Sequence, residues 1–547
     1  MIKCPSCGSD LRYDPAEKQF VCDYCGSRFD VQELLDRKII TAKEYREAAG
    51  ISEPEDEASG QEEDTSTYEA SVFTCPMCGG ELLSTDETYV TFCSYCGSSV
   101  MLDRTRKRVA APDVIIPFAV SKEDCEATYK KMLAGAPYVP TEMKTQEQIA
   151  KFRGIYMPYW VYSAEVSGPL TVRGEREKRK GDYIYTDHYA IDTILDGKYD
   201  GIAYDASSTF SDSLSSAVAP FNFDEAQPFT PAYMSGFYAD TEDVPQKTYE
   251  EDTARVVKSD VVKRLYTDAE FAKNGAGKEE IGKSPIIPKV KERLGYFPVW
   301  FLSFRSKTGD RVSYAVINGQ TGEIAADLPV SFGKYFIGSL LIAVPIFLLL
   351  TLFATFTPRM TLLIAAALGA VGMIIANNQL NRVFMRDKGL DDKGLTTVNP
   401  PKEESYGSKK KTNYKNIGES FSAVGTVLII VGFLAGRVFA PLFLIVVPAL
   451  VFIGIGSHLK TKISPDRVVY SAPAKDKLKV MWKPLVTVIL CAGMAIVNPF
   501  RDYVCYAGVI AGMALVCWCF LDIIKAHNYL TTRKLPQLGA RGGDENA

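Results

Sequence analysis

Histidine is scarce in this chain of 547 residues, which contains only His188, His458 and His527. None of the three lies near a cysteine in the sequence, whereas a catalytic zinc site keeps an open coordination position and usually includes histidine. The chain also has no phosphate-binding loop and no dinucleotide-binding fingerprint, so it lacks the nucleotide chemistry of a helicase. Asp187 beside His188 suggests a base, but no nucleophile stands next to it. We therefore expect a protein that is not an enzyme.

A strong excess of one charge is also absent. The formal net charge is −4, so the chain as a whole has no bias towards polyanions. Charge is concentrated locally instead: residues 53–69 are acidic and are expected to form a flexible linker, whereas residues 104–108 and 173–180 are basic. The first basic run could contact nucleic acid or the anionic inner leaflet of a membrane. A solvated linker or a hairpin tip is the commoner explanation of both runs.

Cysteine, in contrast, is patterned. Eight of the thirteen cysteines form two copies of Cys-x2-Cys-x14-Cys-x2-Cys, and the second copy follows the first by 71 positions. The members are Cys4, Cys7, Cys22 and Cys25 in the first copy, and Cys75, Cys78, Cys93 and Cys96 in the second. This is the spacing of a four-thiolate zinc site with a β-hairpin between its cysteine pairs. We expect two structural zinc ions, each stabilising a small zinc ribbon.

Other residues repeat with the cysteines. A glycine follows the second cysteine of every pair and permits the positive φ of a tight turn around the metal. Tyr24 and Tyr95 occupy one shared position of the two copies. A disulfide framework is the alternative explanation, but matched Cys-x2-Cys pairs on the reducing side of a membrane favour a metal.

The middle of the chain contains a second duplication. The motif Tyr-x-Pro-x-Trp occurs at residues 156–160 and again at 296–300. Each copy is expected to begin a strand, at 156–166 and 296–305, after a helix, at 121–133 and 248–271. Ser121 is the expected cap of the first helix, and Thr248 with Glu251 forms a capping-box pattern for the second. A β-hairpin is expected at residues 312–326.

These elements predict an α+β region with antiparallel sheets and helices on one face, built from two related halves. Trp160 and Trp300 either mark a binding groove or, as is commoner for such aromatic residues, belong to the core, with the prolines on an edge strand.

Long apolar runs are confined to the C-terminal part. Six segments approach the length that crosses a bilayer, and they are residues 336–356, 361–381, 421–434, 439–457, 485–497 and 503–524. Short connections join them into three hairpins, and long connections rich in lysine and arginine separate the hairpins. By the positive-inside rule these long connections, and with them both termini, are expected in the cytoplasm. We find no signal peptide. The segments contain few ionisable groups, which argues against a proton-coupled pump, and their glycines match ordinary membrane-helix composition.

Together the patterns predict a multidomain protein: two small β zinc ribbons, an α+β cytosolic region with an internal duplication, and an all-α domain of six transmembrane helices. The expected boundaries are residues 1–30 for the first zinc ribbon, 31–70 for a short helix and the acidic linker, 71–103 for the second zinc ribbon, 112–330 for the α+β region, 334–526 for the transmembrane helices and 527–547 for a cytoplasmic tail.

Paired ribbons, a Tyr-x-Pro-x-Trp region and an apolar C-terminal part resemble the bacterial membrane-anchored zinc-ribbon proteins of the TFIIB type. Some of these proteins are associated with the phage-shock membrane-stress system, in which a zinc-ribbon membrane protein works with other membrane and scaffold proteins. The eight cysteines match the ribbon pattern, and the resemblance implies a role in protein–protein interaction during membrane stress.

The leading hypothesis is a non-enzymatic scaffold or adaptor in the cell membrane. Its partners would be cytosolic or membrane proteins and the lipid bilayer, and no small-molecule substrate is evident. Two alternatives remain open. One is a membrane-tethered nucleic-acid-binding regulator, which the acidic linker and the overall charge disfavour. The other is a transporter or channel with cytosolic regulatory domains.

Overall fold

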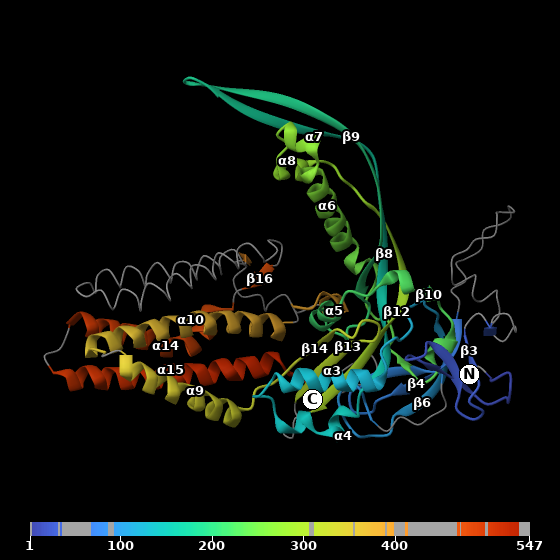
Figure 1. Ribbon diagram of the computed structural model, residues 1–547, viewed down its shortest axis with the longest axis horizontal. Helices are drawn as coiled ribbons and strands as arrows, with labels where there is room; N and C mark the ends of the chain where they lie inside the picture. Colours follow the sequence, from blue (N-terminus) through green and yellow to red (C-terminus); the bar gives the residue numbers. More distant parts are fainter. Residues whose placement is uncertain are drawn as a thin grey trace.

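The computed structural model shown in Figure 1 describes residues 3–30, 33–34, 67–85, 92–305, 311–353, 356–388, 391–398, 411–413, 468–470, 472–497 and 501–534. The third and fourth predicted apolar segments, residues 421–434 and 439–457, lie outside the described residues. So does most of the predicted short helix and acidic linker, residues 31–70, although strand β4 begins within that range, at Thr67.

The first cysteine quartet belongs to a small three-stranded antiparallel sheet. Its strands lie in the order β1 (Leu11–Asp14), β2 (Gln19–Cys22) and β3 (Arg28–Phe29). The β1–β2 hairpin connects the two cysteine pairs, with Leu11 opposite Cys22. The sheet packs on the rest of the protein through Tyr13, whose ring centroid lies 5.2 Å from that of Tyr233.

The central sheet joins strands from both ends of the chain. Its main path runs β10–β7–β12–β8–β11–β5–β4–β6, with β9 paired to β8, β13 to β12, and β14 and β17 to β13. The strands are β4 (Thr67–Thr74), β5 (Glu81–Ser84), β6 (Asp103–Ala110), β7 (Val114–Ile115), β8 (Arg153–Lys180), β9 (Tyr183–Asp205), β10 (Gln227–Pro228), β11 (Tyr238–Ala239), β12 (Lys289–Arg305), β13 (Arg311–Asn318), β14 (Ile324–Ala326) and β17 (Arg533–Lys534). A separate pair consists of β15 (Lys411–Asn413) and β16 (Val468–Tyr470).

Short helices surround this sheet. They are α3 (Lys122–Ala134), α4 (Gln146–Ile149), α5 (Asp212–Val218), α6 (Glu250–Thr267), α7 (Ala269–Lys273), α8 (Lys278–Lys283) and α11 (Lys393–Val398). Ser121 caps α3 by accepting a hydrogen bond from the Asp124 amide. The capping box expected from Thr248 does not form, because a 3₁₀ turn at Gln246–Tyr249 leads directly into α6.

The two Tyr-x-Pro-x-Trp motifs pair with each other. Strands β8 and β12 run antiparallel, with Met157 opposite Phe297 at the centre of the two motifs. Each motif strand also receives a short parallel strand that leads into a helix: β11 on β8, before α6, and β7 on β12, before α3. The local arrangement is therefore nearly two-fold symmetric about Met157 and Phe297.

The motif prolines lie on strands inside the sheet, so the prediction that they lie on an edge strand is wrong. Pro158 pairs with Tyr296, and Pro298 pairs with Tyr156. On the other side of β8, the strand β9 ends opposite Tyr159 and β11 begins opposite Ile155. A proline is tolerated at this point because the gap between the two neighbouring strands demands no N–H donor.

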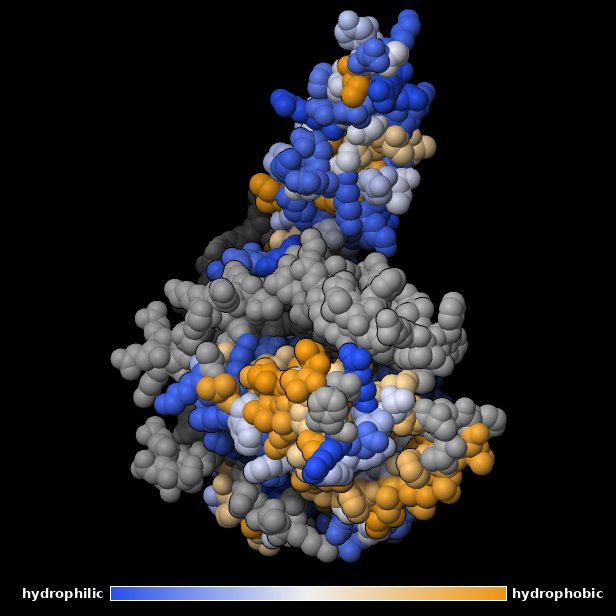
Figure 2. Space-filling view, turned by 90° about the vertical axis from the view of Figure 1, so that its left-hand side faces the viewer, coloured by the Kyte–Doolittle hydropathy of each residue, from blue (hydrophilic) through white to orange (hydrophobic). Residues whose placement is uncertain are grey.

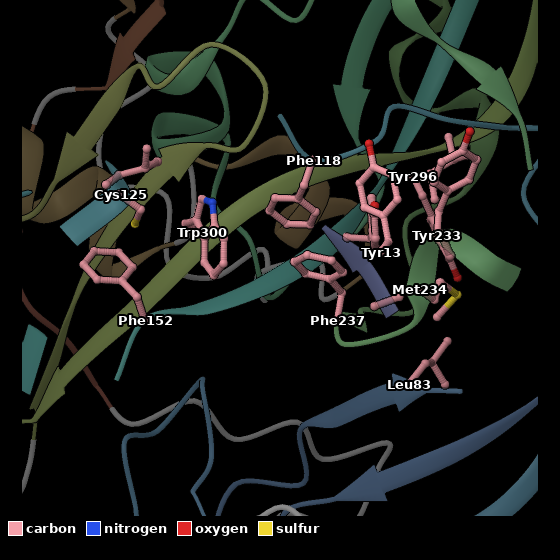
Figure 3. Close-up of a cluster of buried hydrophobic side chains, with 14 of the residues drawn as sticks. Tyr13, Leu83, Phe118, Cys125, Phe152, Tyr233, Met234, Phe237, Tyr296 and Trp300 are labelled. Carbon is pink, nitrogen blue, oxygen red and sulfur yellow. The ribbon is translucent and has the colours of Figure 1, made fainter. Parts of the chain in front are cut away.

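The motif tryptophans belong to the core. Figure 3 shows Trp300 beside Phe118, whose ring centroid lies 5.2 Å away, and Phe237, which is stacked on Phe118 and lies 6.1 Å from Trp300. The indole N–H of Trp300 donates to the Val120 carbonyl at 2.9 Å, and that of Trp160 donates to an equivalent carbonyl before the 3₁₀ turn at 2.8 Å. Both indoles thus fix the start of a helical segment.

The β8–β9 hairpin continues past Lys289, the first residue of β12, as a long projection (Figure 1). We call its residues 166–197 the arm. Helices α6, α7 and α8 pack along the arm through a separate apolar cluster that includes Val172, Ile191, Val257 and Ile281. The tip of the arm bends towards the side on which the C-terminal helices lie.

Four helices in the described ranges are long and apolar enough to cross a membrane: α9 (Phe332–Phe353), α10 (Pro358–Asp387), α14 (Ala474–Val497) and α15 (Asp502–Leu530). They include the first, second, fifth and sixth predicted segments. Figure 2 looks at the end of this bundle and shows apolar side chains gathered over it, with hydrophilic side chains over the arm. The four helices suggest a membrane-spanning region.

Small residues lie where α10, α14 and α15 cross. The Thr487 hydroxyl donates to the Gly512 carbonyl at 3.3 Å, and a side chain at Gly512 would approach the Cys491 sulfur to 2.6 Å. Gly508 and Gly369 also lie at close approaches. A side chain added at Gly508 would clash with the Met494 sulfur, and one added at Gly369 would come within 3.2 Å of the Pro484 carbonyl oxygen. The sequence favoured ordinary composition as the reason for these glycines, whereas the structure shows that they permit the helices to pack closely.

Candidate metal centres

The four cysteines of the first ribbon converge at the base of the β1–β2 hairpin. The Sγ atoms of Cys4 and Cys25 are 3.6 Å apart, and those of Cys7 and Cys22 are 3.5 Å apart. All four sulfur atoms lie within 4.8 Å of one another. The side chains of Cys7 and Cys25 are exposed, whereas Cys4 and Cys22 are buried.

The second quartet repeats this geometry in a different environment. Cys75 and Cys96 are separated by 3.8 Å between sulfur atoms, and Cys78 and Cys93 by 3.7 Å. All four side chains are buried. Along the chain, the quartet lies between the end of β4 and the start of β6. It shares an apolar cluster with Phe301 of the central sheet.

These separations fit a tetrahedral metal. A zinc–sulfur distance of about 2.3 Å places the corners of a tetrahedron about 3.8 Å apart. A disulfide would require about 2.05 Å, and all eight thiols are free. The two quartets could therefore each hold a zinc ion.

The backbone at each cysteine pair forms the same tight turn. The amide of Gly8 donates to the Cys4 carbonyl at 2.8 Å, and the amide of Gly79 donates to the Cys75 carbonyl at the same distance. Gly8 and Gly79 have φ angles of 77° and 71°, which L-residues with a side chain rarely adopt. The other two cysteine pairs repeat this turn at Gly26 and Gly97. The turn places the two sulfur atoms of a pair on one side of the chain.

Two thiols of the second quartet, Cys78 and Cys93, resist ionisation beside the other two. Hydrogen bonding to Cys75 is the largest cause that raises the pKa of Cys78, and it also raises the pKa of Cys93. Burial adds to both shifts. Four thiolates in this space therefore require a bound cation, which a divalent metal supplies.

The two ribbons differ most in what covers them. Tyr95 of the second ribbon is buried against Phe301 at a centroid distance of 6.1 Å, and its carbonyl accepts a hydrogen bond from the Tyr314 hydroxyl at 2.8 Å. Tyr24 occupies the same position in the first ribbon and is exposed. The second ribbon is therefore part of the central sheet, whereas the first presents both of its metal-binding turns to solvent.

The remaining residues that the sequence singled out do not converge on a site. His188 lies on the exposed arm, with Nδ1 at 3.2 Å from Glu175. The neighbouring Asp187 forms an ion pair with Lys178, whose hydrogen bond lowers the pKa of Asp187. The basic run at residues 104–108 lies in β6, paired with β4, and the run at 173–180 lies at the tip of β8, so neither is a linker.

One further cavity has no motif associated with it in the sequence. It measures about 490 Å³ and lies at the end of β9, where Asp205, Asp212 and Tyr249 meet. These residues belong to β9, α5 and the 3₁₀ turn before α6, and their sequence positions show no characteristic spacing.

The chain is 25% identical over 339 residues to the uncharacterized protein YdjG of Bacillus subtilis (strain 168), and the match covers 61% of this chain and 91% of that protein. No protein-family model matches the chain, and no solved structure matches it. The metal centres are therefore assigned from their own geometry: two four-cysteine clusters in a chain that also carries four helices apolar enough to cross a membrane.

Proposed function

We propose that this chain is a non-enzymatic integral membrane protein that holds two structural zinc ions and acts as a scaffold or adaptor. Its ribbons and central sheet would lie on the cytoplasmic side, with both termini, because the connections between the apolar segments are rich in lysine and arginine. In that compartment thiols stay reduced and remain available to zinc. The proposed role is to dock a protein partner at the cell membrane.

The observation that carries this proposal is the unequal environment of the two ribbons. The inner face of the first ribbon is fixed, because Tyr13 packs on Tyr233 and the Ser235 hydroxyl donates to the Leu11 carbonyl at 2.7 Å. The outer face exposes Tyr24 between two ligand cysteines. An exposed tyrosine on a rigid turn is typical of the residues that dominate protein–protein binding energy.

A role in membrane stress is part of the proposal, and the resemblance to membrane-anchored zinc-ribbon proteins supports it. The partner would then be a membrane or scaffold protein that the cell mobilises when the bilayer is damaged. The zinc ions would only maintain the shape of the docking surface, because a closed four-thiolate site leaves no position for a substrate.

The test is crosslinking in native membranes followed by identification of the captured proteins. We expect Tyr24→Ala to remove the main captured protein while leaving the zinc content unchanged. Tyr183→Ala is the matched control, since Tyr183 is an exposed tyrosine on the arm. A set of captured proteins that is identical for wild type and Tyr24→Ala, under membrane stress and without it, would sink the proposal.

A second candidate function is supported by one feature of the surface. Strand β6 presents Arg106, Lys107 and Arg108 around a shallow groove that also includes Lys3 of the first ribbon. Such a groove could bind the phosphates of a nucleic acid. Filter binding of duplex DNA to the full chain decides the question: affinity that falls steeply with salt, and that Lys107→Ala weakens, would favour this candidate over the scaffold.

A further inference from the structure

The near two-fold symmetry of the central sheet makes Asp205 and Asn318 equivalent. Asp205 is the last residue of β9 and lies opposite Tyr159, and Asn318 is the last residue of β13 and lies opposite Val299. The next amide donates to the carbonyl of the motif proline in both halves, at 2.8 Å each time. The two side chains can therefore be compared directly.

The side chain of Asn318 is fully hydrogen-bonded, to the segment at the end of α5 and to its own loop. Its amide group donates to the carbonyls of Val218 and Pro220, at 2.8 and 3.3 Å. Its side-chain oxygen accepts from the amides of Gln320 and Thr321, at 2.9 and 3.1 Å. This buried polar side chain has no unmet hydrogen bond, as is normal in protein interiors.

Asp205 does not follow this pattern. Its side chain is only 3% exposed, yet its Oδ2 atom has no hydrogen-bond partner. An unpartnered buried carboxylate oxygen is costly to the folded state. Burial, followed by the charges of Asp212 and Asp392, raises the pKa of Asp205. Asp205 is one of the residues that line the 490 Å³ cavity, so a ligand bound there lies beside its side chain.

The charged groups around the cavity leave a negative excess. Asp212 accepts hydrogen bonds from the Tyr249 hydroxyl at 2.9 Å and from the Lys393 backbone amide at 2.6 Å, which are both neutral donors. The Lys393 ammonium pairs with Asp252 instead. Within the described residues, neither Asp205 nor Asp212 forms an ion pair with a basic side chain.

Six aromatic rings make up much of the remaining lining, and the Lys393 ammonium lies 5.3 Å from the centroid of one of them, Tyr249. Tyr204 and Tyr249 stack with ring centroids 4.6 Å apart, and Tyr159 and Phe297 stack at 4.5 Å. The complete aromatic lining is Tyr159, Tyr204, Tyr249, Phe221, Phe223 and Phe297. Aromatic faces attract cations, and a carboxylate adds specificity for one that carries N–H donors.

A metal ion is a poorer fit than an organic cation. In the described parts of the chain, the groups of three or more Cys, His, Asp or Glu ligand atoms that lie within 4.8 Å of one another are the two cysteine quartets. No three carboxylates of the cavity therefore converge on one point as a compact metal site requires. A volume of about 490 Å³ lies instead in the range of small-molecule sites.

We propose that this cavity binds a small organic ammonium ion, whose N–H groups hydrogen-bond to Asp205 and Asp212 while its carbon skeleton packs against the aromatic walls. The ammonium group can belong to a free amine or to the ethanolamine head of a lipid, since the chemistry of recognition is the same. The site is independent of the zinc centres and of the scaffold role.

The test is calorimetric titration of the full chain in nanodiscs with 2-phenylethylamine and, as its neutral counterpart of nearly equal shape, 2-phenylethanol. We expect the amine to bind at least about tenfold more tightly than the alcohol, a difference of about 1.4 kcal/mol. Asp205→Asn should abolish this preference. Asp196→Asn is the matched control, because Asp196 is an exposed carboxylate on the same strand.

Folding is monitored in the same experiment. Asp205→Asn should unfold at the same temperature as the wild type or a higher one, because it removes a buried charge with an unmet hydrogen bond. If that variant fails to fold, Asp212→Asn, which is only half-buried, replaces it with the same expected loss of preference. Equal binding of amine and alcohol, absence of binding, or a preference that survives both substitutions would overturn the proposal.

The source of the ammonium group is identified in a separate arm. Nanodiscs with phosphatidylethanolamine are compared with nanodiscs of phosphatidylcholine at equal surface charge. Weaker apparent binding of 2-phenylethylamine in the first kind indicates competition by the lipid head, and equal binding indicates a free amine. Both results presuppose the amine preference of the wild type, and neither replaces it.

Discussion

The guanidinium of Arg311 lies 4.0 Å from the centroid of the Tyr529 ring, and this contact joins β13 of the central sheet to the end of α15. The same side chain donates to the Tyr529 carbonyl at 2.8 Å and to the Thr532 hydroxyl at 2.7 Å. Strand β17 then pairs with β13 directly. The C-terminal end of α15 is therefore attached to the sheet that contains the second zinc ribbon.

Arg311→Ala is expected to loosen this junction without unfolding either part. Hydrogen bonds to charged groups contribute about 1.5 to 3 kcal/mol each, and the variant loses several of them together with a cation–π contact. Hydrogen exchange of residues 529–534 should accelerate, while exchange in β8 and β12 stays at the wild-type rate. Arg176→Ala, which removes an exposed cation from the arm, serves as the control. Unchanged exchange at residues 529–534 would contradict the role given to Arg311.

The two zinc centres should respond differently to the loss of one ligand. Cys7→Ser is expected to release one of two zinc ions and to leave the central sheet folded, because the first ribbon lies outside that sheet. Cys93→Ser should prevent stable folding, since a structural zinc contributes about 10 to 16 kcal/mol of binding energy and a typical protein has only about 5 to 15 kcal/mol of stability. Metal analysis and tryptophan fluorescence, which reports on buried Trp300, measure both effects. Equal destabilisation by the two variants would refute the difference between the ribbons.

The sequence predicted the two four-cysteine clusters because their ligand pattern is local. Each cysteine pair lies within one tight turn, and the spacing alone specifies two ligands on one side of the chain. The cavity at Asp205 could not be predicted, because its carboxylates and aromatic rings come from elements that are separate in the sequence. Only the folded arrangement of β8, β9 and α5 places them next to one another. Asp205 and Tyr249 are far apart in the sequence, and neither belongs to a recognisable motif.

The length of the elements was predicted less well, for a physical reason. Alternation of apolar and polar residues identifies a strand with one buried face. The tip of the arm exposes both faces, so residues 173–180 carry charges at consecutive positions and resemble a loop. Helix α14 begins at Ala474, whereas the predicted apolar segment begins at residue 485. The prediction started late because the first turns of the helix carry lysines, which interrupt the apolar run. One of them, Lys483, pairs with Asp522 of α15 inside the bundle.

The packing of the apolar helices can be tested with two glycines. At Gly512 an added Cβ would approach the Cys491 sulfur to 2.6 Å and Thr487 to 3.2 Å, whereas at Gly493 it would meet nothing within 4 Å. Gly512→Ala is expected to destabilise the bundle by about 1 to 3 kcal/mol through overpacking. Gly493→Ala should be neutral or stabilising by up to about 1 kcal/mol, because alanine is the better helix former. Unfolding in mixed detergent measures both, and a Gly512→Ala bundle as stable as that of Gly493→Ala would contradict the close packing.

The stability of the protein should fall as the pH rises from about 4 to about 7, in part because of Asp392. Burial, followed by the charge of Asp212, raises the pKa of Asp392 from 3.8 to about 7. In this interval the folded protein retains a proton on Asp392 that the unfolded chain has already released, so raising the pH favours unfolding. Asn at this position remains neutral and still accepts the hydrogen bond that Asp392 receives from the Leu395 amide at 2.8 Å.

Asp392→Asn is therefore expected to match the wild type near pH 4 and to exceed it above pH 7, by at most about 4 kcal/mol for a shift of roughly three units. Thermal unfolding from pH 4 to pH 8 measures the difference between the two slopes. Asp196→Asn is the control, because its exposed carboxylate lies on the arm, away from Asp392. Parallel curves for Asp392→Asn and wild type over this interval would show that Asp392 ionises freely in the folded protein.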